Sequence, residues 1–365
     1  MLERSNSIQL DEAAVARWNA LLERTSVLPD GVSVMSRYEL ARLARDVHAA
    51  DAEDRLLTWS EGGDVAGILP AIVTREPGAL RPKRLRLMTD LYPGRPGPLV
   101  ADYPGPTEPL VRGLLDSEGW DTMELTWVAG SAAEQCFVAL AAELKLAVRR
   151  QPPIDCPYIR FPDSWDEFLG RLSKKFRYNL RSREKKLRQA GELDMARIER
   201  IEQVAPFLAA VRQIENNSWK EAAGTSLTTN PRQWEFHEKM MPACARQDML
   251  RCYLMTLDSE PIAYIIGLVD ADTFYCLKSS FVDAHRKFSP GVILKAWAMQ
   301  ELIEEGVGWW DFVGPSAEHK RQWTETSYRL SRYLVFNRGF RGTVLRLRFD
   351  LSTRLRGETV TDGDH

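Results

Sequence analysis

The chain has 365 residues, which is enough for two domains that each bury a core. Apolar residues make up 44% and charged residues 27% of it, as in ordinary soluble globular proteins, and the formal net charge of −2 does not favour a nucleic-acid partner. The sequence contains neither the long apolar run of a membrane span nor the apolar core of a secretory signal. We therefore expect no membrane span and a cytoplasmic location.

The cysteines and histidines show no spacing that suits a metal site or a disulfide framework. No C-x-x-C pair occurs, and His285 and His319 are not spaced as metal ligands. The sequence therefore predicts reduced thiols and no metal. The five cysteines are Cys136, Cys156, Cys244, Cys252 and Cys276.

The first 150 residues alternate between helical and strand-like patterns. Apolar residues at helical spacing predict helices at 11–23, 37–50 and 131–144, and a short helix ends near Glu118. The turn at 61–64 joins two alternating segments into a predicted hairpin. The predicted strands are 55–59, 65–74, 85–91 and 121–128, and a stretch rich in Pro and Gly covers 92–109.

A segment with three prolines, Gln151–Pro157, is the predicted linker between two domains. Its position predicts an N-terminal domain at 1–157 and a C-terminal domain at 158–345. The remaining residues, 346–365, are expected to form a tail. Arginines alternate with apolar residues from 340 to 356, which suits a basic amphipathic helix or a strand, and we expect a surface element with no assigned chemistry.

The second half begins with the most highly charged stretch of the chain. Residues 164–172 and 173–189 have helical patterns that end before Gly191, as two helices or as one bent helix. The second of these patterns usually forms a solvated helix face, but it also suits a phosphate-rich ligand. Its only acid is Glu184, and its basic residues are Lys174, Lys175, Arg177, Arg181, Arg183, Lys185, Lys186 and Arg188.

The remaining elements follow in a simple order. Helices are predicted at 204–220 and 231–240, and three strands come next, separated by short turns. A helix and a short apolar strand complete the series. The three strands are Met249–Leu257, Ile262–Val269 and Thr273–Phe281, the helix is Val292–Glu305, and the last strand is Val307–Val313.

The turn before that last helix has the features of an anion-binding helix start. Ser289 is a good N-cap, Pro290 suits the first helical position, and Gly291 has no side chain to keep a ligand away. A helix N-terminus offers backbone N–H groups and the positive end of the dipole, and Arg286 and Lys287 lie just before it. The turn therefore predicts a phosphate or pyrophosphate site, with an ordinary structural turn as the alternative.

These residues resemble the GNAT acyltransferase superfamily. Three antiparallel strands that lead into a ligand-facing helix are its core order, and Arg286-x-x-Ser289-x-Gly291 is similar to its pyrophosphate loop (Arg/Gln-x-x-Gly-x-Gly/Ala), with Ser in place of the first Gly. The runs Trp310-Asp311-Phe312-Val313-Gly314 and Lys320-x-x-Trp323 resemble the branch of cellulose-biosynthesis-type acetyltransferases, which is related to the Fem-type aminoacyl transferases. The resemblance covers Trp165–Phe340 well and the first half in outline.

The two halves also resemble each other. Ala66–Pro70 corresponds to Ala263–Gly267, and Pro104–Gly105 corresponds to Pro290–Gly291. We therefore expect an α/β (α+β) fold made of two tandem GNAT-like domains, each a mixed, mostly antiparallel sheet flanked by helices. The first copy lacks the Arg-x-x-Ser-x-Gly turn, so we expect it to bind no cofactor and to help shape the acceptor cleft.

The resemblance implies an acyl-coenzyme A co-substrate, with acetyl-coenzyme A favoured and no metal. A backbone N–H of the strand Thr273–Phe281 would donate to the thioester oxygen. The basic helix would then face the 3′-phosphate of coenzyme A or an RNA backbone, because Fem-type enzymes have a similar helix. The residues expected to bind the co-substrate are Arg286, Lys287, Ser289, Pro290, Gly291 and Val292.

Transfer to an amine also needs a route for the amine's proton. Asp311 is the first candidate, because burial beside Trp309 and Trp310 would raise its pKa; it would equally suit a cap of the turn at Gly314–Pro315. The competing candidates are Tyr275, His319 and Glu318. The candidates for substrate binding are Lys320, Trp219, Lys278 and Arg177.

The predicted function is direct transfer of an acyl group from acyl-coenzyme A to an amine of a small molecule, a sugar or a peptide. The first alternative is a Fem-like transferase with tRNA as the carrier of the donor, which the basic helix favours and the near-neutral net charge disfavours. The second alternative is a degenerate binding module without catalysis. The sequence does not identify the acceptor, the acyl chain or the oligomeric state.

Overall fold

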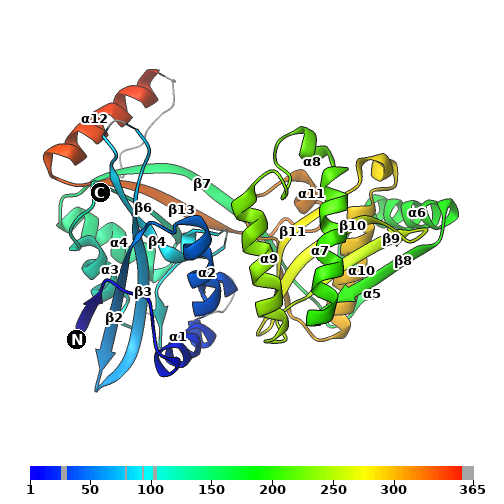
Figure 1. Cartoon of the computed structure of the whole chain (residues 1–365), viewed down its shortest axis with the longest axis horizontal. Coiled ribbons are helices and arrows are strands. Elements are labelled where there is room, and N and C mark those ends of the chain that lie inside the picture. Colours follow the sequence, from blue (N-terminus) through cyan, green and yellow to red (C-terminus); the bar gives the residue numbers. More distant parts are fainter. Residues whose placement is uncertain (26–30, 79, 93, 102–104, 356–365) are drawn as a thin grey trace. The chain divides into compact units, whose positions relative to one another are not determined.

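The computed structural model describes residues 1–25, 31–78, 80–92, 94–101 and 105–355 (Figure 1). The chain divides into two compact units: unit 1 contains Met1–Cys156 and the segment from Tyr328 onward, and unit 2 contains Pro157–Ser327. The sequence predicts that residues up to 345 belong to the second domain. In the structure, β13 (Ser327–Phe336) pairs with β6 (Thr122–Val128), so this segment completes the sheet of unit 1.

Unit 1 is built on a sheet with the strand order β1-β2-β3-β4-β6-β13, and the short β5 pairs with β3. Its remaining strands are β1 (Leu2–Ser5), β2 (Glu53–Glu61), β3 (Asp64–Arg75), β4 (Lys83–Leu87) and β5 (Leu99–Val100). Its helices are α1 (Glu12–Thr25), α2 (Tyr38–His48), α3 (Thr107–Leu115), α4 (Ala132–Glu143) and α12 (Phe340–Leu355), with 3-10 turns η1 (Val34–Ser36) and η2 (Met88–Asp90).

Helices cover both faces of this sheet. The side chains of α1 and α2, including Trp18 and Ala41, pack with Ile68 and Ile72 of β3 on one face. The side chains of α3 and α4 pack on the other face, where they surround Leu69 and the central strand β6. The alternation along β3 explains why one strand supplies both cores.

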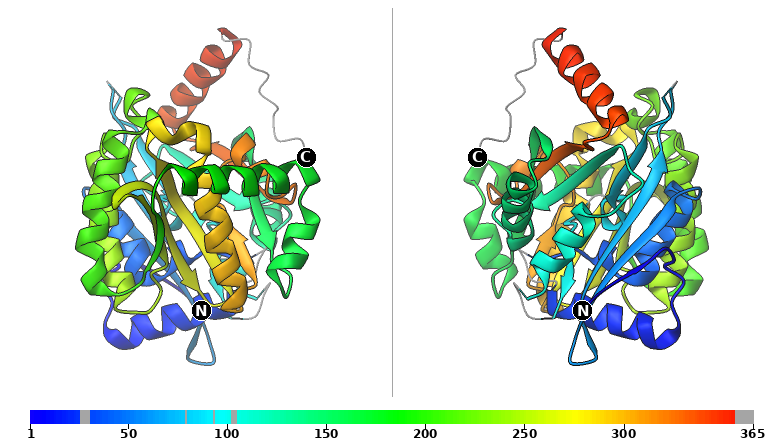
Figure 2. Two further views of the ribbon diagram at one scale, coloured as in Figure 1. Left: turned by 90° about the vertical axis from the view of Figure 1, so that its right-hand side faces the viewer. Right: turned by 90° about the vertical axis from the view of Figure 1, so that its left-hand side faces the viewer.

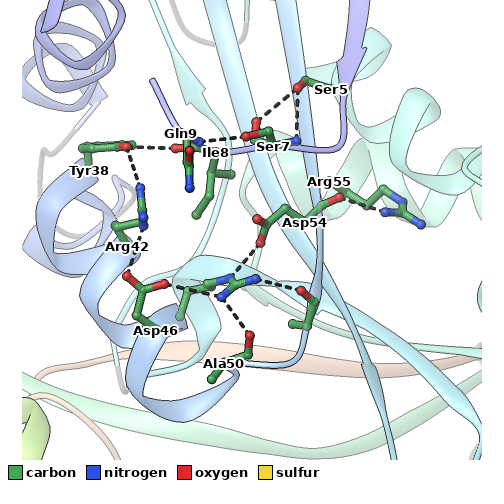
Figure 3. A network of polar contacts seen from close by, with 12 residues as sticks. Ser5, Ser7, Ile8, Gln9, Tyr38, Arg42, Asp46, Ala50, Asp54 and Arg55 are labelled. Atoms are coloured by element: carbon green, nitrogen blue, oxygen red, sulfur yellow. Dashed lines mark hydrogen bonds and ion pairs between the residues drawn. The ribbon is translucent and has the colours of Figure 1, made fainter. Parts of the chain in front are cut away.

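A polar network fastens the N-terminal segment to α2 (Figure 3). The Tyr38 hydroxyl donates to the Ile8 carbonyl oxygen at 2.8 Å, and Arg42 of the next helical turn donates to the Tyr38 hydroxyl. One turn further along, Arg45 donates to Asp54 of β2 at 2.9 Å. The first half of unit 1 is therefore held by paired polar groups as well as by its core.

Unit 2 is built on a sheet with the strand order β7-β12-β11-β10-β9-β8. Its strands are the end of β7 (Ala147–Arg160), β8 (Leu193–Ile198), β9 (Cys252–Leu257), β10 (Glu260–Asp270), β11 (Thr273–Phe281) and β12 (Trp309–Asp311). Its helices are α5 (Trp165–Arg171), α6 (Lys174–Ala190), α7 (Ile201–Asn216), α8 (Trp219–Ala222), α9 (Pro231–Ala245), α10 (Pro290–Glu304) and α11 (Glu318–Arg321), with the 3-10 turn η3 (Asp283–Phe288).

Helices cover both faces of the second sheet too. Helix α10 packs on one face of β9, β10 and β11 together with α5 and α6, and the left view of Figure 2 shows α6 crossing α10. Helix α7 packs on the other face of β10 and contacts α9. In Figure 1 α7 lies in front of β10 and β11. The sheet thus forms the middle of three layers, which is how a buried strand such as β10 covers both of its faces.

The two units repeat one order of elements. In unit 1, β2, β3 and β4 are antiparallel neighbours, and α3 leads to β6, which pairs with β4 in parallel at three positions. In unit 2, β9, β10 and β11 are antiparallel neighbours, and α10 leads to β12, which pairs with β11 in parallel at three positions. The expectation of two tandem domains with mixed, mostly antiparallel sheets is confirmed.

Two sequence expectations need correction. The proline-rich linker predicted at Gln151–Pro157 is part of the long strand β7, where Pro152 and Pro153 stand among partly exposed residues. The tail predicted at 346–365 begins inside α12, which Arg149 holds through two hydrogen bonds of 2.8 Å to Asp350; residues 356–365 lie outside the described part. Proline content and alternation alone did not distinguish these elements from a linker and a tail.

Candidate active site

The sheet of unit 2 opens where β11 and β12 stop pairing. The parallel register runs from Thr273 and Trp309 to Tyr275 and Asp311, after which β11 continues to Phe281 without β12. A register shift accompanies this point, because Gly267 pairs with Cys276 and Ile266 pairs with Lys278 across β10. Such a bulge re-aims the side chains that follow it, so Lys278 and later residues change face relative to a regular strand.

The predicted turn lies next to this opening and starts α10 at Pro290, as expected. The expectation that Ser289 caps the helix with its side chain is wrong, because Ser289 has left-handed backbone angles (φ 53°, ψ 54°) and makes no side-chain cap bond. Its carbonyl oxygen instead accepts from the Val292 and Ile293 N–H groups at 2.9 and 3.3 Å. A left-handed conformation is natural for glycine, which explains why the family pattern has Gly where this chain has Ser.

The basic residues of the turn are exposed on η3. Arg286 donates to Asp283 through Nε at 2.7 Å, and the Lys287 ammonium lies 4.9 Å from the centroid of the Phe288 ring. Exposed contacts of this kind are weak. Both cations can therefore turn toward an anion at the helix start without a large energetic cost.

Gly291 brings the first turn of α10 close to the end of β11. A Cβ at this position would lie 3.3 Å from Cδ1 of Phe281, which leaves no room for a larger side chain unless the ring moves. The helix start and the unpaired part of β11 are thus in direct contact. The glycine is needed for this close approach.

Asp311 is fully buried at the end of β12, and the structure gives it the role of a turn cap. Its Oδ1 accepts from the Val313 N–H at 2.8 Å, and Val313 and Gly314 both have positive φ angles. The Lys320 ammonium donates to the Val313 and Pro315 carbonyl oxygens at 3.0 and 2.9 Å. The bond to Val313 is consistent with a cap of the turn that leads to Gly314–Pro315, and the catalytic role of Asp311 stays a prediction.

Several lysines converge on Ser279, in the unpaired part of β11. Lys220 of α8 donates to the Ser279 carbonyl oxygen at 2.6 Å, and Lys295 of α10 donates to the Ser279 Oγ at 3.0 Å. Lys295 is only 7% exposed, whereas Ser279 is half-buried. Lys278 is the neighbouring residue. This set of residues, Lys220, Lys278, Ser279 and Lys295, is called the lysine cluster below.

Burial lowers the pKa of all three amines, and repulsion from other lysines adds to this for two of them. Burial lowers the pKa of Lys220, Lys278 and Lys295, and the charges of neighbouring lysines lower the pKa of Lys278 and Lys295 further. The nearest compensating carboxylate is Glu215, which is fully buried and accepts from the Tyr264 hydroxyl at 2.5 Å and from the Leu227 N–H at 2.6 Å.

The same charges also lower the pKa of His319 on α11. Partial burial of its ring and the ammonium groups of Lys295, Lys320 and Lys220 lower the pKa of His319 to about 4. The imidazole is therefore neutral at physiological pH. It can accept a proton, but only as a weak base.

A groove of about 480 Å³ lies between α6 and α10 on the same unit. Its floor is apolar, with Ile293 and two tryptophans, Trp165 and Trp297, and three arginines of α6 line it: Arg177, Arg181 and Arg188. The one acid in the lining, Glu184, forms an ion pair with Arg188. The basic run of the sequence is thus partly a groove wall and not only a solvated face.

The structure unites some of the predicted residues and separates others. Tyr275 and Asp311 are register partners, and Lys278, His319 and Lys320 interact electrostatically in this region. Arg177 lies in the α6 groove, and Trp219 is 45% exposed on α8. Sequence reasoning missed Ser279, Lys295 and Glu215 as site residues. The signal for Lys295 was its position inside the apolar run 292–299 of a buried helix.

Two kinds of feature are absent from the described residues: a membrane-spanning helix and a metal-binding group of side chains. Within that part of the chain no helix is both long and apolar enough to cross a membrane. Across the same residues no group of three or more His, Cys, Asp and Glu side chains has an arrangement that could hold a metal ion.

Comparisons with known proteins agree with this geometry. Residues 174–321 match a family model described as an acetyltransferase (GNAT) domain, and no curated protein matched the chain. FemX has a similar structure, with a TM-score of 0.61, 14% identity and coverage of 94% of this chain and 99% of FemX.

Two further solved structures share the fold. The C-terminal domain of a lysylphosphatidylglycerol synthetase from Agrobacterium fabrum has a TM-score of 0.53, 12% identity and coverage of 97% of this chain and 98% of its own. For L-PGS from Bacillus licheniformis the values are 0.51, 14%, 96% and 98%. Residues 174–321 of the chain therefore match a GNAT acetyltransferase domain, and the whole chain shares its fold with FemX, with the lysylphosphatidylglycerol synthetase domain and with L-PGS.

Proposed function

We propose that unit 2 is an N-acyltransferase that moves an acyl group from acyl-coenzyme A to an amine. The observation that carries this proposal is the opening between β11 and β12, which lies against the N-terminus of α10 through the contact of Gly291 with Phe281. An extended thioester could enter the sheet at this opening while its phosphates stay at the helix start. The match to a GNAT acetyltransferase domain supports the same assignment.

The exposed part of the turn would bind the phosphates of the co-substrate. Arg286 and Lys287 are flexible cations on η3, and the left-handed Ser289 turns the chain into α10. Pro290, Gly291 and Val292 then present backbone at the positive end of the helix dipole. A backbone N–H of the unpaired part of β11 would donate to the carbonyl oxygen of the acyl group.

The proton of the acceptor amine needs a base near the same opening. Asp311, Tyr275 and His319 remain the proposed candidates. Of the three, His319 is a neutral imidazole at physiological pH and can accept a proton. Lys278 and Lys320 are basic side chains in the same region. They favour an acceptor that carries an acidic group. The acceptor class is an amine of a small molecule, a sugar or a peptide.

A second candidate is transfer of an aminoacyl group from tRNA. The α6 groove favours it, because arginines and tryptophans suit phosphates and unstacked bases. The similarity of the fold to FemX across both units is consistent with this candidate. A third possibility is a binding module that retains a ligand without turnover.

The test is a turnover assay with the full-length protein. Purified protein is mixed with acetyl-coenzyme A and a panel of amino acids, amino sugars and peptides, and the released thiol is measured. Amine-dependent release supports the proposal. Tight binding of acetyl-coenzyme A without release for any amine favours the binding module, and turnover only with aminoacyl-tRNA overturns the coenzyme A assignment.

A further inference from the structure

Helix α12 carries a stripe of exposed apolar side chains. Ten large apolar side chains are exposed in the described part of the chain, and four of them lie on this one helix of unit 1. At about 100° per residue, the four positions fall within about 80° of one another around the helix axis. They are Phe340, Leu347, Leu351 and Leu355, with exposed fractions of 83%, 54%, 60% and 88%. Single exposed leucines are ordinary, but a stripe of them marks an interaction surface.

The opposite side of α12 is bound to unit 1. Arg149 of β7 forms two hydrogen bonds of 2.8 Å with Asp350, and the ring of Phe349 packs on Phe336 of β13 with the centroids 5.8 Å apart. The buried Thr353 lies on the same side of the helix. These contacts fix the rotation of α12 about its axis and hold the apolar stripe outward. Both views of Figure 2 show the red helix α12 projecting from unit 1.

Arginines flank the stripe. At the same spacing of about 100° per residue, Arg348 lies just beyond one edge of the stripe and Arg354 just beyond the other. Both side chains are exposed. The helix contains four arginines and one acid, Asp350, which pairs with Arg149 on the bound side. An apolar stripe between basic side chains is the pattern of a helix that lies in a membrane interface.

We propose that α12 docks unit 1 on an anionic phospholipid membrane. The apolar stripe enters the boundary between headgroups and acyl chains, and Arg348 and Arg354 bind the lipid phosphates. The stripe runs for about 22 Å along the helix, so it fits an extended surface better than a small ligand. This inference goes beyond the proposed acyltransferase function and does not depend on it.

The charges disfavour a second copy of the chain as the occupant. Two α12 helices packed stripe to stripe would bring the arginines of one copy against those of the other, and the one carboxylate of each helix is already paired with Arg149. A membrane with acidic headgroups supplies the opposite charge along its whole surface. Its fluid chains also adapt to the convex side of a single helix.

Helix α6 is more basic than α12 but lacks such a stripe. Tyr178 is the one exposed large apolar side chain that α6 contributes within the described residues. A basic helix without apolar anchors attracts anionic lipids through charge alone, and binding of that kind is lost at high salt. Helix α6 is therefore the competing site that the experiment has to separate from α12.

The experiment measures binding of the full-length protein to lipid vesicles by sedimentation. One set of vesicles consists of phosphatidylcholine, and the other set also contains phosphatidylglycerol. We expect wild type to bind the second set about tenfold more tightly or better, and to keep part of this binding at high salt through the apolar stripe. On the vesicles, hydrogen exchange should slow in residues 340–355 and stay unchanged in residues 174–190.

Two double variants separate the apolar contribution from the charged one. Leu347→Gln with Leu351→Gln removes the centre of the stripe without a change of charge, and Arg348→Gln with Arg354→Gln removes the flanking charges. Each should weaken binding to the phosphatidylglycerol vesicles by about tenfold or more. All four side chains are exposed, so circular dichroism and thermal unfolding should stay as in wild type.

Matched controls make the same changes elsewhere on unit 1. Val138→Gln removes an exposed apolar side chain from α4, and Arg112→Gln with Arg329→Gln removes two positive charges from α3 and β13. Both controls should bind the vesicles as wild type does. Binding that is lost in the two α12 variants and kept in the controls supports the proposal.

Three results would overturn it. The first is a folded wild type that binds neither set of vesicles or binds both equally. The second is binding that the α12 variants keep and that Lys185→Gln with Lys186→Gln removes, which would assign the membrane contact to α6. The third is a monomer–dimer equilibrium in ultracentrifugation, without vesicle binding, that Leu347→Gln with Leu351→Gln abolishes. No acyl donor enters these measurements, so a failure of the proposed acyltransferase function leaves their result unchanged.

Discussion

The two units surround their charged side chains in different ways. In unit 1, the parallel strands β4 and β6 carry matched charges: Glu124 faces Arg84 at 3.0 Å and Arg332 at 3.5 Å, and Arg86 pairs with Glu76. In unit 2, the corresponding strands β11 and β12 adjoin the lysine cluster, in which Lys220 donates to the Ser279 carbonyl oxygen and Lys295 donates to the Ser279 hydroxyl oxygen. Buried lysines without a carboxylate partner cost stability, so the lysine cluster is the feature of unit 2 to test against the ion pairs of unit 1.

The N-termini of α3 in unit 1 and α10 in unit 2 also differ. In unit 1, a Cβ at Gly67 would lie 2.7 Å from Pro106 and 2.8 Å from Leu110, so α3 packs tightly on β3, and β5 pairs with β3 beside it. In unit 2, the start of α10 contacts the end of β11, beyond its last pair with β12, and carries exposed cations. In unit 1, α3 and β5 pack against β3 beside the helix start. In unit 2, β11 extends beyond its last pair with β12 at the corresponding place.

A buried glutamate in each unit allows the largest test of this difference. Glu215 accepts from the Tyr264 hydroxyl and the Leu227 N–H, and Glu134 of unit 1 accepts from the Tyr333 hydroxyl and the Gly130 N–H. Replacement of Glu215 by alanine leaves two buried donors unsatisfied, at about 1–3 kcal/mol each, whereas Glu134→Ala releases one buried donor, the Tyr333 hydroxyl, and the N–H of the exposed Gly130. Glu215→Ala should cost more than Glu134→Ala at pH 7, because Lys220 and Lys278 also lose their nearest carboxylate.

Urea unfolding of both variants at pH 7 and pH 10 measures this difference. The excess cost of Glu215→Ala should shrink at pH 10, because the lysines of the folded protein, whose pKa values are lowered, lose their protons and a neutral amine no longer needs the carboxylate. An equal cost for the two variants at pH 7 would show that the lysine cluster carries no unmatched charge.

Asp90 of unit 1 gives the next largest effect. Burial, with a smaller contribution from the charge of Glu124, raises the pKa of Asp90 to about 6 from 3.8, although Thr126 donates to it. The folded state therefore holds this proton at pH values where the unfolded state has lost it, and stability falls as the pH rises from 3.8 to 6. Asp90→Asn should remove this loss, which is about 3 kcal/mol for two pKa units, and the pH dependence of urea unfolding checks it.

Lys295 of unit 2 should make stability rise with pH, opposite to the effect of Asp90. Its pKa is lowered in the folded state, so between that value and the unfolded value of 10.5 the unfolded chain binds more protons and stability rises with pH. Lys295→Met should flatten this rise and should stabilise the protein near pH 7. A wild-type stability that does not rise between pH 7 and 10, or a variant with an unchanged slope, would contradict the unmatched charge of Lys295.

Ser289→Gly should have the smallest effect. The left-handed conformation costs an L-residue about 1–2 kcal/mol, and glycine removes that strain while it loses about 0.5–1 kcal/mol through chain entropy. We expect a net stabilisation below about 1 kcal/mol and unchanged binding at the turn. Thermal unfolding measures the first expectation, and a clear destabilisation would show that the serine side chain has a role of its own.

The sequence predicts the fold of unit 2 well because its signals are local. Apolar runs between short turns set β10 and β11. Pro290 and Gly306 set the ends of α10, where the Gly306 and Val307 N–H groups donate to Ile303 and Leu302 as in a Schellman cap. The same signals found the hairpin of β2 and β3 in unit 1.

The missed features depend on contacts between distant segments. The exchange of β13 into unit 1 depends on its register with β6, which no local pattern encodes. Ser289 looks like an ordinary N-cap until its backbone angles are known. The lysine cluster joins α8, β11 and α10, and each lysine alone reads as a surface residue. The sequence predicted Asp311 as a site residue, but its hydrogen bond with the Val313 N–H is visible only in the structure.

The most direct test of the account is calorimetric titration of the full-length protein with acetyl-coenzyme A. The comparison uses wild type, Arg286→Ala in unit 2, and Arg329→Ala, which removes an equally exposed arginine paired with Asp155. The account predicts micromolar binding to wild type and to Arg329→Ala, with a loss of about tenfold or more for Arg286→Ala. No binding to the folded wild type, or binding that Arg286→Ala leaves unchanged, would contradict a co-substrate site at the start of α10.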